Sequence, residues 1–76
     1  MSFKPLDVVV LQNEVPRHSL RKGDLGTVVD VYEPDGLEVE FLTASGDTEA
    51  VVTRKDSDVR AAAKNDLLTV RSYGVA

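Results

Sequence analysis

The sequence predicts a mainly all-β fold, a five-stranded SH3-like small barrel with one short helical turn before the last strand. Three observations indicate this fold. Runs of strand length rich in Val, Leu and Thr recur along the chain, a long polar connection follows the first run, and turns with glycine in fourth place separate the middle runs. The 76 residues suffice for a single domain, residues 1–76, with an ordered core expected at about residues 6–71.

The first strand is predicted over residues 6–11, a continuous apolar run, after a loose or edge-pairing start at residues 1–5. Because this run does not alternate, we expect it to be covered on both sides over part of its length by the chain termini. Residues 12–23 form a long connection in which Pro16 argues against a strand. Its apolar residues, Val15 and Leu20, are expected to pin the loop to the barrel.

The second strand is predicted over residues 25–33. Gly23 suits a left-handed backbone where the loop ends. Asp24 is expected to turn its carboxylate onto the amide two residues ahead. Gly26 inside the strand indicates a bulge, a bend or a close approach of backbone to a neighbour.

Two hairpins follow the second strand. Residues 33–36 predict a type I turn with Gly36 left-handed, and residues 43–46 repeat the pattern with Gly46. Between them, residues 37–42 alternate and predict a strand with Leu37, Val39 and Phe41 in the core. Residues 48–53 predict the fourth strand.

The last part of the chain is expected to hold a short helix and the fifth strand. Asp56 or Ser57 can begin a helix over residues 59–65, and Asn65 can end it. Residues 67–71 predict the final strand. Residues 72–76 are expected to fray, although Tyr73 could pack back on the barrel.

Composition excludes several activities. The chain has no cysteine and one histidine, which argues against thiol chemistry and against a metal site. We expect no signal peptide and no membrane span, and therefore a cytoplasmic protein. The net charge is −4, and residues 24–53 carry eight acidic residues with no lysine or arginine. Both flanking segments are net basic.

No constellation of residues indicates catalysis or cofactor binding. His18 and Ser19 are sequence neighbours and cannot generally act as base and nucleophile. Glu38 and Glu40 could serve carbohydrate chemistry, but paired glutamates on a strand usually protect a solvated sheet. Gly23 and Gly26 lead into a strand, so they do not form a phosphate-binding loop. We therefore predict a non-enzyme with no catalytic, cofactor-binding or metal-binding residues.

Residues 22–29, Lys-Gly-Asp-Leu-Gly-Thr-Val-Val, resemble the KOW element of ribosomal proteins and transcription factors. A broader resemblance covers residues 6–11, Pro16, Leu20, residues 22–32 and residues 38–41. These are similar to a family of small bacterial and cyanobacterial proteins known only as a domain of unknown function. The resemblance implies an SH3-like barrel and a place in a two-gene operon of the toxin–antitoxin type. The segment 59–65 departs from this family, whose tail is shorter.

The leading functional hypothesis is a protein-interaction module whose partner carries a basic patch. The partner would contact an acidic sheet face formed by Asp30, Glu38, Glu40 and Glu49. An antitoxin-like or regulatory subunit that binds the product of a neighbouring gene would fit this hypothesis. The protein itself is expected to be a monomer or a weak homodimer. A structural subunit that adds an edge strand to a larger assembly is a third class.

The alternative is a KOW-like RNA-binding or other nucleic-acid-binding protein that uses the basic loop of residues 17–22. Arg17, Arg21 and Lys22 would contact phosphates. Such binding usually needs a basic face with exposed aromatic rings. The acidic middle of the chain and its few aromatic residues, Phe3, Tyr32, Phe41 and Tyr73, make nucleic acid the less favoured partner.

Overall fold

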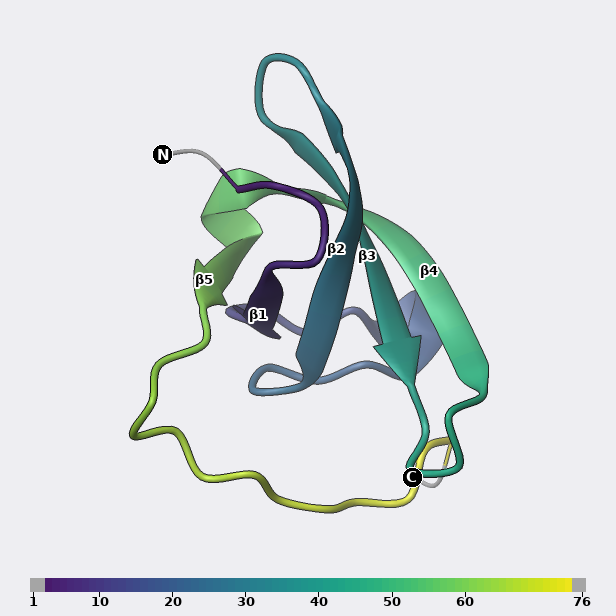
Figure 1. Ribbon diagram of the computed structural model, residues 1–76. Coiled ribbons are helices and arrows are strands. Elements are labelled where there is room, and N and C mark those ends of the chain that lie inside the picture. Colours follow the sequence, from purple (N-terminus) through teal and green to yellow (C-terminus); the bar gives the residue numbers. More distant parts are fainter. Residues whose placement is uncertain (1–2, 75–76) are drawn as a thin grey trace.

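The computed structural model describes residues 3–74, which form five antiparallel strands in one sheet with the order β4-β3-β2-β1-β5 (Figure 1). The strands are β1 (Val8–Leu11), β2 (Leu25–Tyr32), β3 (Gly36–Leu42), β4 (Thr48–Lys55) and β5 (Val59–Ala61). Two 3-10 turns are η1 (Pro16–His18) and η2 (Asp56–Asp58). The sheet curls so that η2 joins its two edge strands, β4 and β5. The SH3-like barrel, with one helical turn before the last strand, is confirmed.

The inner face of the curled sheet holds the core. Alternation in β3 buries Leu37, Val39 and Phe41, as predicted. The other core residues are Phe3, Val9, Leu11, Val15, Leu20, Val28, Ala50, Val52 and Val59. Phe3 corrects the expectation of a loose start, because the segment before β1 folds its aromatic ring into the core. Within residues 3–74 no helix has the length and apolar composition that crossing a membrane would require.

β1 is covered on both sides, as its continuous apolar run predicted. Val9 and Leu11 point into the core, whereas Val10 is only 6% exposed without belonging to the core cluster. Residues Leu67 and Leu68, near the C-terminus, line a cavity beside Val10 on the outer side of the sheet.

The loop between β1 and β2 is pinned as predicted. Val15 and Leu20 are both buried and form a backbone bridge that closes the loop around η1. Gly23 has a φ of +96°, which is the left-handed conformation expected where the loop ends. The Asp24 carboxylate differs from expectation, because it accepts the backbone N–H of Arg21 at 2.8 Å instead of an amide further along.

Gly26 is a site of close approach. A Cβ atom built on Gly26 would lie 2.6 Å from Cγ1 of Val39 and 2.8 Å from Cε1 of Phe41. The backbone of β2 therefore rests directly on two core side chains of β3. Of the three roles considered for Gly26, the close approach is confirmed, while the β2 bulge lies further on, between Val28 and Asp30.

The two hairpin turns differ from each other. Gly46 has a φ of +91°, as predicted for the fourth position of its turn. The prediction for Gly36 is wrong, because its φ is not left-handed and the Glu33–Pro34 peptide bond is cis. Gly36 is instead the first residue of β3 and pairs with Tyr32. A Cβ atom on Gly36 would lie 3.3 Å from Cβ of Tyr32. This position therefore requires the small size of glycine and not its conformational freedom.

The predicted helix at residues 59–65 and strand at residues 67–71 are both wrong. Val59 begins β5, pairs with Leu11 of β1 and is 3% exposed. Residues 62–74 run outside the sheet. The helix propensity of the alanine-rich segment is worth less than about 1 kcal/mol per residue. It is outweighed by the burial of Val59 and by the hydrogen bonds that the free edge of β1 needs.

We expect Gly26→Ala to lower the free energy of unfolding by about 1–3 kcal/mol, because the added methyl group would overlap Val39 and Phe41. Gly26→Val should prevent folding. Thermal unfolding followed by circular dichroism measures both effects. Thr27→Ala, in the same strand but not in the core, is the matched control. A melting temperature of Gly26→Ala equal to that of the parent chain would contradict the close approach.

Candidate functional site

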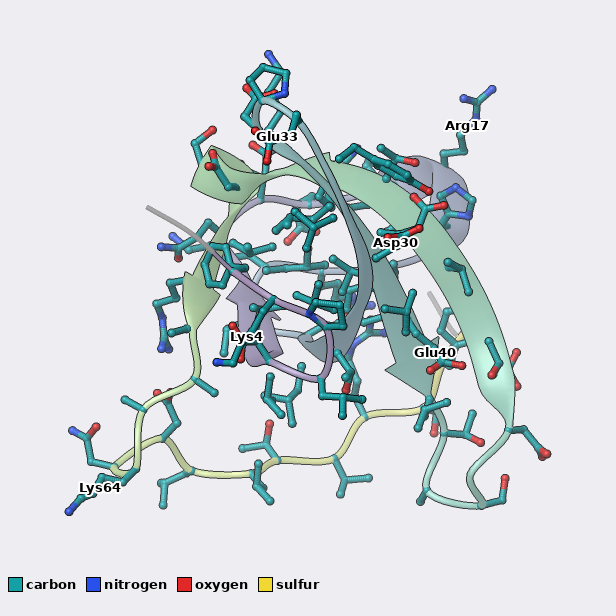
Figure 2. The ribbon with its side chains drawn as sticks, turned by 45° about the horizontal axis from the view of Figure 1, so that its top comes forward. Lys4, Arg17, Asp30, Glu33, Glu40 and Lys64 are labelled. Carbon is teal, nitrogen blue, oxygen red and sulfur yellow. The ribbon has the colours of Figure 1, made fainter. Side chains whose placement is uncertain are left out.

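The outer face of β2 and β3 carries three carboxylates close together. Asp30 stands directly opposite Glu38 in the ladder, and Glu40 lies two residues further along β3. We call Asp30, Glu38 and Glu40 the acidic face. In Figure 2, Asp30 and Glu40 lie along the strands, whereas Glu33 lies at the tip of the β2–β3 hairpin. Three of the four predicted partner-binding residues are therefore brought together.

A bulge in β2 puts Asp30 on this face. The register shifts between Val28, which pairs with Val39 in the core, and Asp30, which pairs with Glu38. In a regular strand of the same sequence, residues 28 and 30 would alternate onto one side, and Asp30 would point to the same side as the buried Val28. The bulge also leaves Val29 exposed. Simple periodicity along the sequence gives no sign of this switch.

The acidic face is not neutralised within the molecule. Glu38 accepts the hydroxyl of Thr53, and Glu40 accepts the hydroxyl of Thr48. Asp30 accepts the backbone N–H of Val31 at 2.8 Å. Among residues 3–74, no lysine or arginine forms an ion pair with any of these three carboxylates. Their negative charges therefore face solvent uncompensated.

The phenol of Tyr32, at the end of β2, lies in the electrostatic field of the acidic face. The negative charge of Glu38, followed by partial desolvation and the charge of Asp30, raises the pKa of the Tyr32 phenol above its ordinary value. Both charges disfavour a further negative charge on the phenolate. The exposed ring of Tyr32 thus sits beside the acidic face, and this neighbourhood could not be read from the sequence.

Glu49 lies apart from Asp30 and Glu38. It occupies a second irregularity, where Ala50 pairs with Phe41 while Thr48 pairs with Leu42. Its side chain lines a cavity together with Glu40. The prediction that all four carboxylates form one face is therefore corrected. Glu40 belongs to the acidic face and also to the cavity that Glu49 lines.

The basic loop does not form one cluster. Arg21 and Lys22 line a cavity of about 320 Å³ that also includes Arg60, but Arg17 is not among its lining residues. Arg17 lies on η1 and points outward (Figure 2). The backbone N–H of Lys22 donates to the Glu14 carboxylate at 2.7 Å, so an acidic group lies inside the loop. The proposed phosphate contacts are thus divided between two places.

Residues 62–74, which we call the C-terminal strap, cross the barrel between two polar anchors. At the first anchor, the Arg60 guanidinium donates two hydrogen bonds to Asp66, at 2.8 and 2.9 Å. At the second, Arg71 forms a paired contact with Asp24 and also donates to the Ser19 carbonyl at 3.1 Å. The first anchor joins residues six positions apart, whereas the contacts of the second join residues 47 and 52 positions apart, for which the sequence carries no local signal.

Tyr73 completes the second anchor. Its hydroxyl donates to the His18 carbonyl at 2.8 Å, so the prediction that Tyr73 packs back on the barrel is confirmed. Residues 75–76, which were expected to fray with the rest of the terminus, lie outside the described residues. His18 and Ser19 contribute only their carbonyls to the strap contacts.

The anchors hold their carboxylates ionised. Hydrogen bonds from the Arg60 guanidinium and the Ala63 backbone lower the pKa of Asp66 to about 2. Burial alone would raise the pKa of Asp24, but hydrogen bonds from Arg71 and from the Arg21 backbone outweigh it and lower that pKa. The same contact raises the pKa of the Arg71 guanidinium. Both anchors therefore persist at neutral pH.

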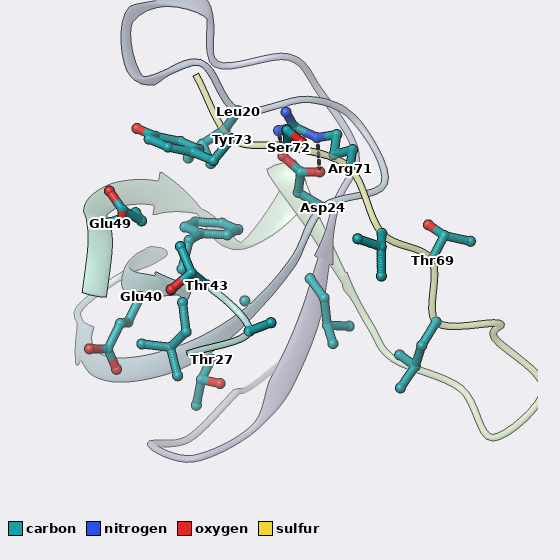
Figure 3. Close-up of a pocket in the computed structure, with 17 residues that line it drawn as sticks. Leu20, Asp24, Thr27, Glu40, Thr43, Glu49, Thr69, Arg71, Ser72 and Tyr73 are labelled. Atoms are coloured by element: carbon teal, nitrogen blue, oxygen red, sulfur yellow. Dashed lines mark hydrogen bonds and ion pairs between the residues drawn. The ribbon is translucent and has the colours of Figure 1, made fainter. Parts of the chain in front are cut away.

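A cavity of about 600 Å³ separates the strap from one end of the barrel. Its apolar lining comes from the barrel residues Leu25, Phe41, Leu42 and Ala44 and from the strap residues Leu68 and Val70. In Figure 3, Glu40 and Glu49 lie on the side opposite Thr69 of the strap, and the Asp24–Arg71 pair lies at one end. The cavity therefore combines apolar walls with two carboxylates.

We expect Glu38→Gln to stabilise the protein by a few tenths of a kcal/mol to about 1 kcal/mol, because it removes one of two like charges in a directly opposed pair. The same change should lower the pKa of Tyr32 towards its ordinary value, since Glu38 is the main cause of its rise. Thermal unfolding and an NMR pH titration of the Tyr32 ring measure the two effects. Glu33→Gln is the control. A destabilised variant with an unchanged Tyr32 titration would show that the opposed charges do not interact.

The strap should detach in acid before the barrel unfolds. The pKa of Asp66 is about 2 in the folded chain against 3.8 as its reference value, so the released form takes up protons first. The anchor therefore stabilises the strap above about pH 4 and loses this effect as the pH falls towards 2. NMR signals of residues 63–73 should change over this window while those of β2 and β3 stay. Arg71→Gln should loosen the second anchor already at pH 7, and unchanged strap signals in that variant would contradict its role.

Comparison with known proteins gives one match. A family model described as Domain of unknown function (DUF4926) matches residues 6–61. No curated protein and no solved structure matches the chain. The matched residues end with β5, so the C-terminal strap lies beyond them. Because the match covers well over half of the chain and agrees with the resemblance found in the sequence, the protein belongs to the DUF4926 family, a domain of unknown function.

Proposed function

We propose that this protein is a non-catalytic interaction module of the cytoplasm that binds the basic surface of a protein partner. The observation that carries the proposal is the directly opposed pair Asp30 and Glu38, which no described cation neutralises. Opposed like charges destabilise a sheet by up to about 1 kcal/mol. A lysine or arginine of a partner placed between them would remove that repulsion.

The surroundings of the carboxylates suit a protein interface. Val29, Tyr32 and Val51 are exposed on strands β2 and β4 around the acidic face. Tyrosine is favoured at binding hot spots, because its ring gives apolar contact area and its hydroxyl can form a hydrogen bond. Apolar contact would supply affinity, and the carboxylates would speed association and reject acidic proteins.

The proposed partner is a single protein with a basic patch, encoded by a neighbouring gene. An antitoxin-like or regulatory role would follow if that neighbour were a toxin or nuclease. The proposed state of the protein before binding is a monomer or a weak homodimer. Binding would shield the carboxylates, so affinity should fall as salt increases.

RNA binding is the less favoured alternative. Arg21 and Lys22 line the same cavity, but their backbone N–H groups donate to the carboxylates of Asp24 and Glu14. A site for a polyanion would need to overcome these charges as well as the acidic face. Salt-dependent binding of single-stranded RNA would therefore count against the proposal.

Capture of the partner tests the proposal. A tagged copy of the chain, incubated with native lysate, should retain one stoichiometric basic protein. Glu38→Lys combined with Glu40→Lys should release that protein, because both substitutions reverse charges of the acidic face. Glu33→Lys combined with Asp35→Lys changes the net charge equally at the hairpin tip and should retain it.

Two results would overturn the proposal. One is a partner that both charge-reversed variants retain equally. The other is salt-dependent binding of single-stranded RNA at micromolar protein that Arg17→Ala combined with Lys22→Ala abolishes. That second result would transfer the function to the basic loop.

A further inference from the structure

We infer that the cavity between the C-terminal strap and the barrel is a clamp for one apolar side chain of a protein segment, with a lysine or arginine of that segment next to it. This inference rests on the proposed function and names the second part of the same docking site. The cavity volume of about 600 Å³ lies within the range of protein ligand sites. It would hold a leucine, methionine or aromatic side chain together with the neighbouring atoms of the segment that carries it.

The C-terminal strap is held in place at both ends of the segment that lines the cavity. Residues 67–70 span the distance between the Arg60–Asp66 anchor and the Arg71–Asp24 anchor. Ion pairs with two or more hydrogen bonds hold a segment in a defined position. Both ends of the span are therefore held, so the cavity is present before a ligand arrives.

The span carries apolar side chains that the molecule itself leaves uncovered. Leu67 is 89% exposed, Leu68 80% and Val70 96%. Leu68 and Val70 line the cavity, and Leu42 faces it from the barrel with 53% of its surface exposed. Contiguous exposed apolar surface of this kind marks interaction sites. An apolar side chain between the two walls would cover them together.

The carboxylates decide the chemistry of the occupant. Glu40 and Glu49 lie on the side of the cavity opposite Thr69 of the strap, and neither forms an ion pair within residues 3–74 (Figure 3). A cationic group would be attracted to them, and an anionic ligand would be repelled. Glu40 is also part of the acidic face, so the cavity continues the surface on which the basic partner would lie.

The occupant is therefore a segment of the partner, with an apolar residue followed or preceded by a basic one. The other strap cavity, of about 320 Å³, is lined by cationic side chains together with the carboxylates Asp24 and Asp66, which pair with Arg71 and Arg60. Its carboxylates are therefore already neutralised, whereas Glu40 and Glu49 form no ion pair within residues 3–74. A basic segment is therefore attracted towards Glu40 and Glu49.

The probe is a phage-displayed library of random dodecapeptides selected on the full chain at low salt. We expect the selected peptides to share a large apolar residue beside lysine or arginine. Fluorescence anisotropy of one synthetic peptide then measures affinity. Leu68→Ser combined with Val70→Ser should weaken binding about tenfold or more, because the buried apolar contact is lost.

Controls separate this clamp from the acidic face. Leu6→Ser changes a leucine that is equally exposed, at 80%, but does not line the cavity, and it should leave affinity unchanged. Glu49→Gln should weaken binding of the basic peptide. It should not weaken binding of a copy of the peptide in which norleucine replaces the basic residues. Melting temperatures of the strap, Leu6 and Glu49 variants should match the parent, since the substituted side chains are exposed.

The outcomes distinguish the two proposals. Loss of binding with Glu38→Gln but not with Leu68→Ser and Val70→Ser would overturn the clamp and leave the acidic face. Loss with the strap variants alone would support the clamp and overturn the acidic face as the docking surface. Selected peptides without an apolar and basic pair, or no selected peptide, would overturn the clamp.

Discussion

The contact between the backbone of Gly26 and the side chains of Val39 and Phe41 is the constraint on which the barrel depends. It lets the side chains of Val39 and Phe41 lie against the backbone of β2 on the inner face of the sheet, so a sheet of short strands can curl. Phe41 is held between this backbone and the core, and it also lines the cavity beneath the strap. The position of that cavity therefore follows from the closure of the sheet, and the fold and the proposed clamp share one contact.

The acidic face illustrates how one irregularity changes the chemistry of a surface. The bulge after Val28 rotates Asp30 outward, opposite Glu38, and the next pair, Val31 with Leu37, returns to the core side. A strand without the bulge would bury a carboxylate at this position, at a cost that a chain this small could not offset. The outward pair still repels, and a surface that retains such repulsion is consistent with selection for binding over maximal stability.

The C-terminal strap is stabilised differently from the barrel. Its described contacts with the rest of the chain are polar, whereas its apolar residues face solvent or the cavity. The barrel, by contrast, is held by contacts between its buried apolar residues, and its carboxylates lie outside. The strap therefore depends on ionisation and on salt more than the barrel does. It also lies beyond residues 6–61, which match the family model.

The sequence by itself determined the strands from β1 to β4, the core residues of β3, the pinned loop and the left-handed backbone at Gly23, and it limited Gly26 to a bulge, a bend or a close approach. These follow from local rules of periodicity, burial and backbone conformation, which neighbouring residues are sufficient to express. Only the tertiary structure decided the fifth strand, the grouping of the carboxylates and the position of the strap. Val59 became a strand because the edge of β1 required a partner, against the helix propensity of the residues after it. Asp30 joined Glu38 through a bulge, and Arg71 met Asp24 across most of the chain. Each of these depends on pairing between distant residues, for which one sequence holds no local signal.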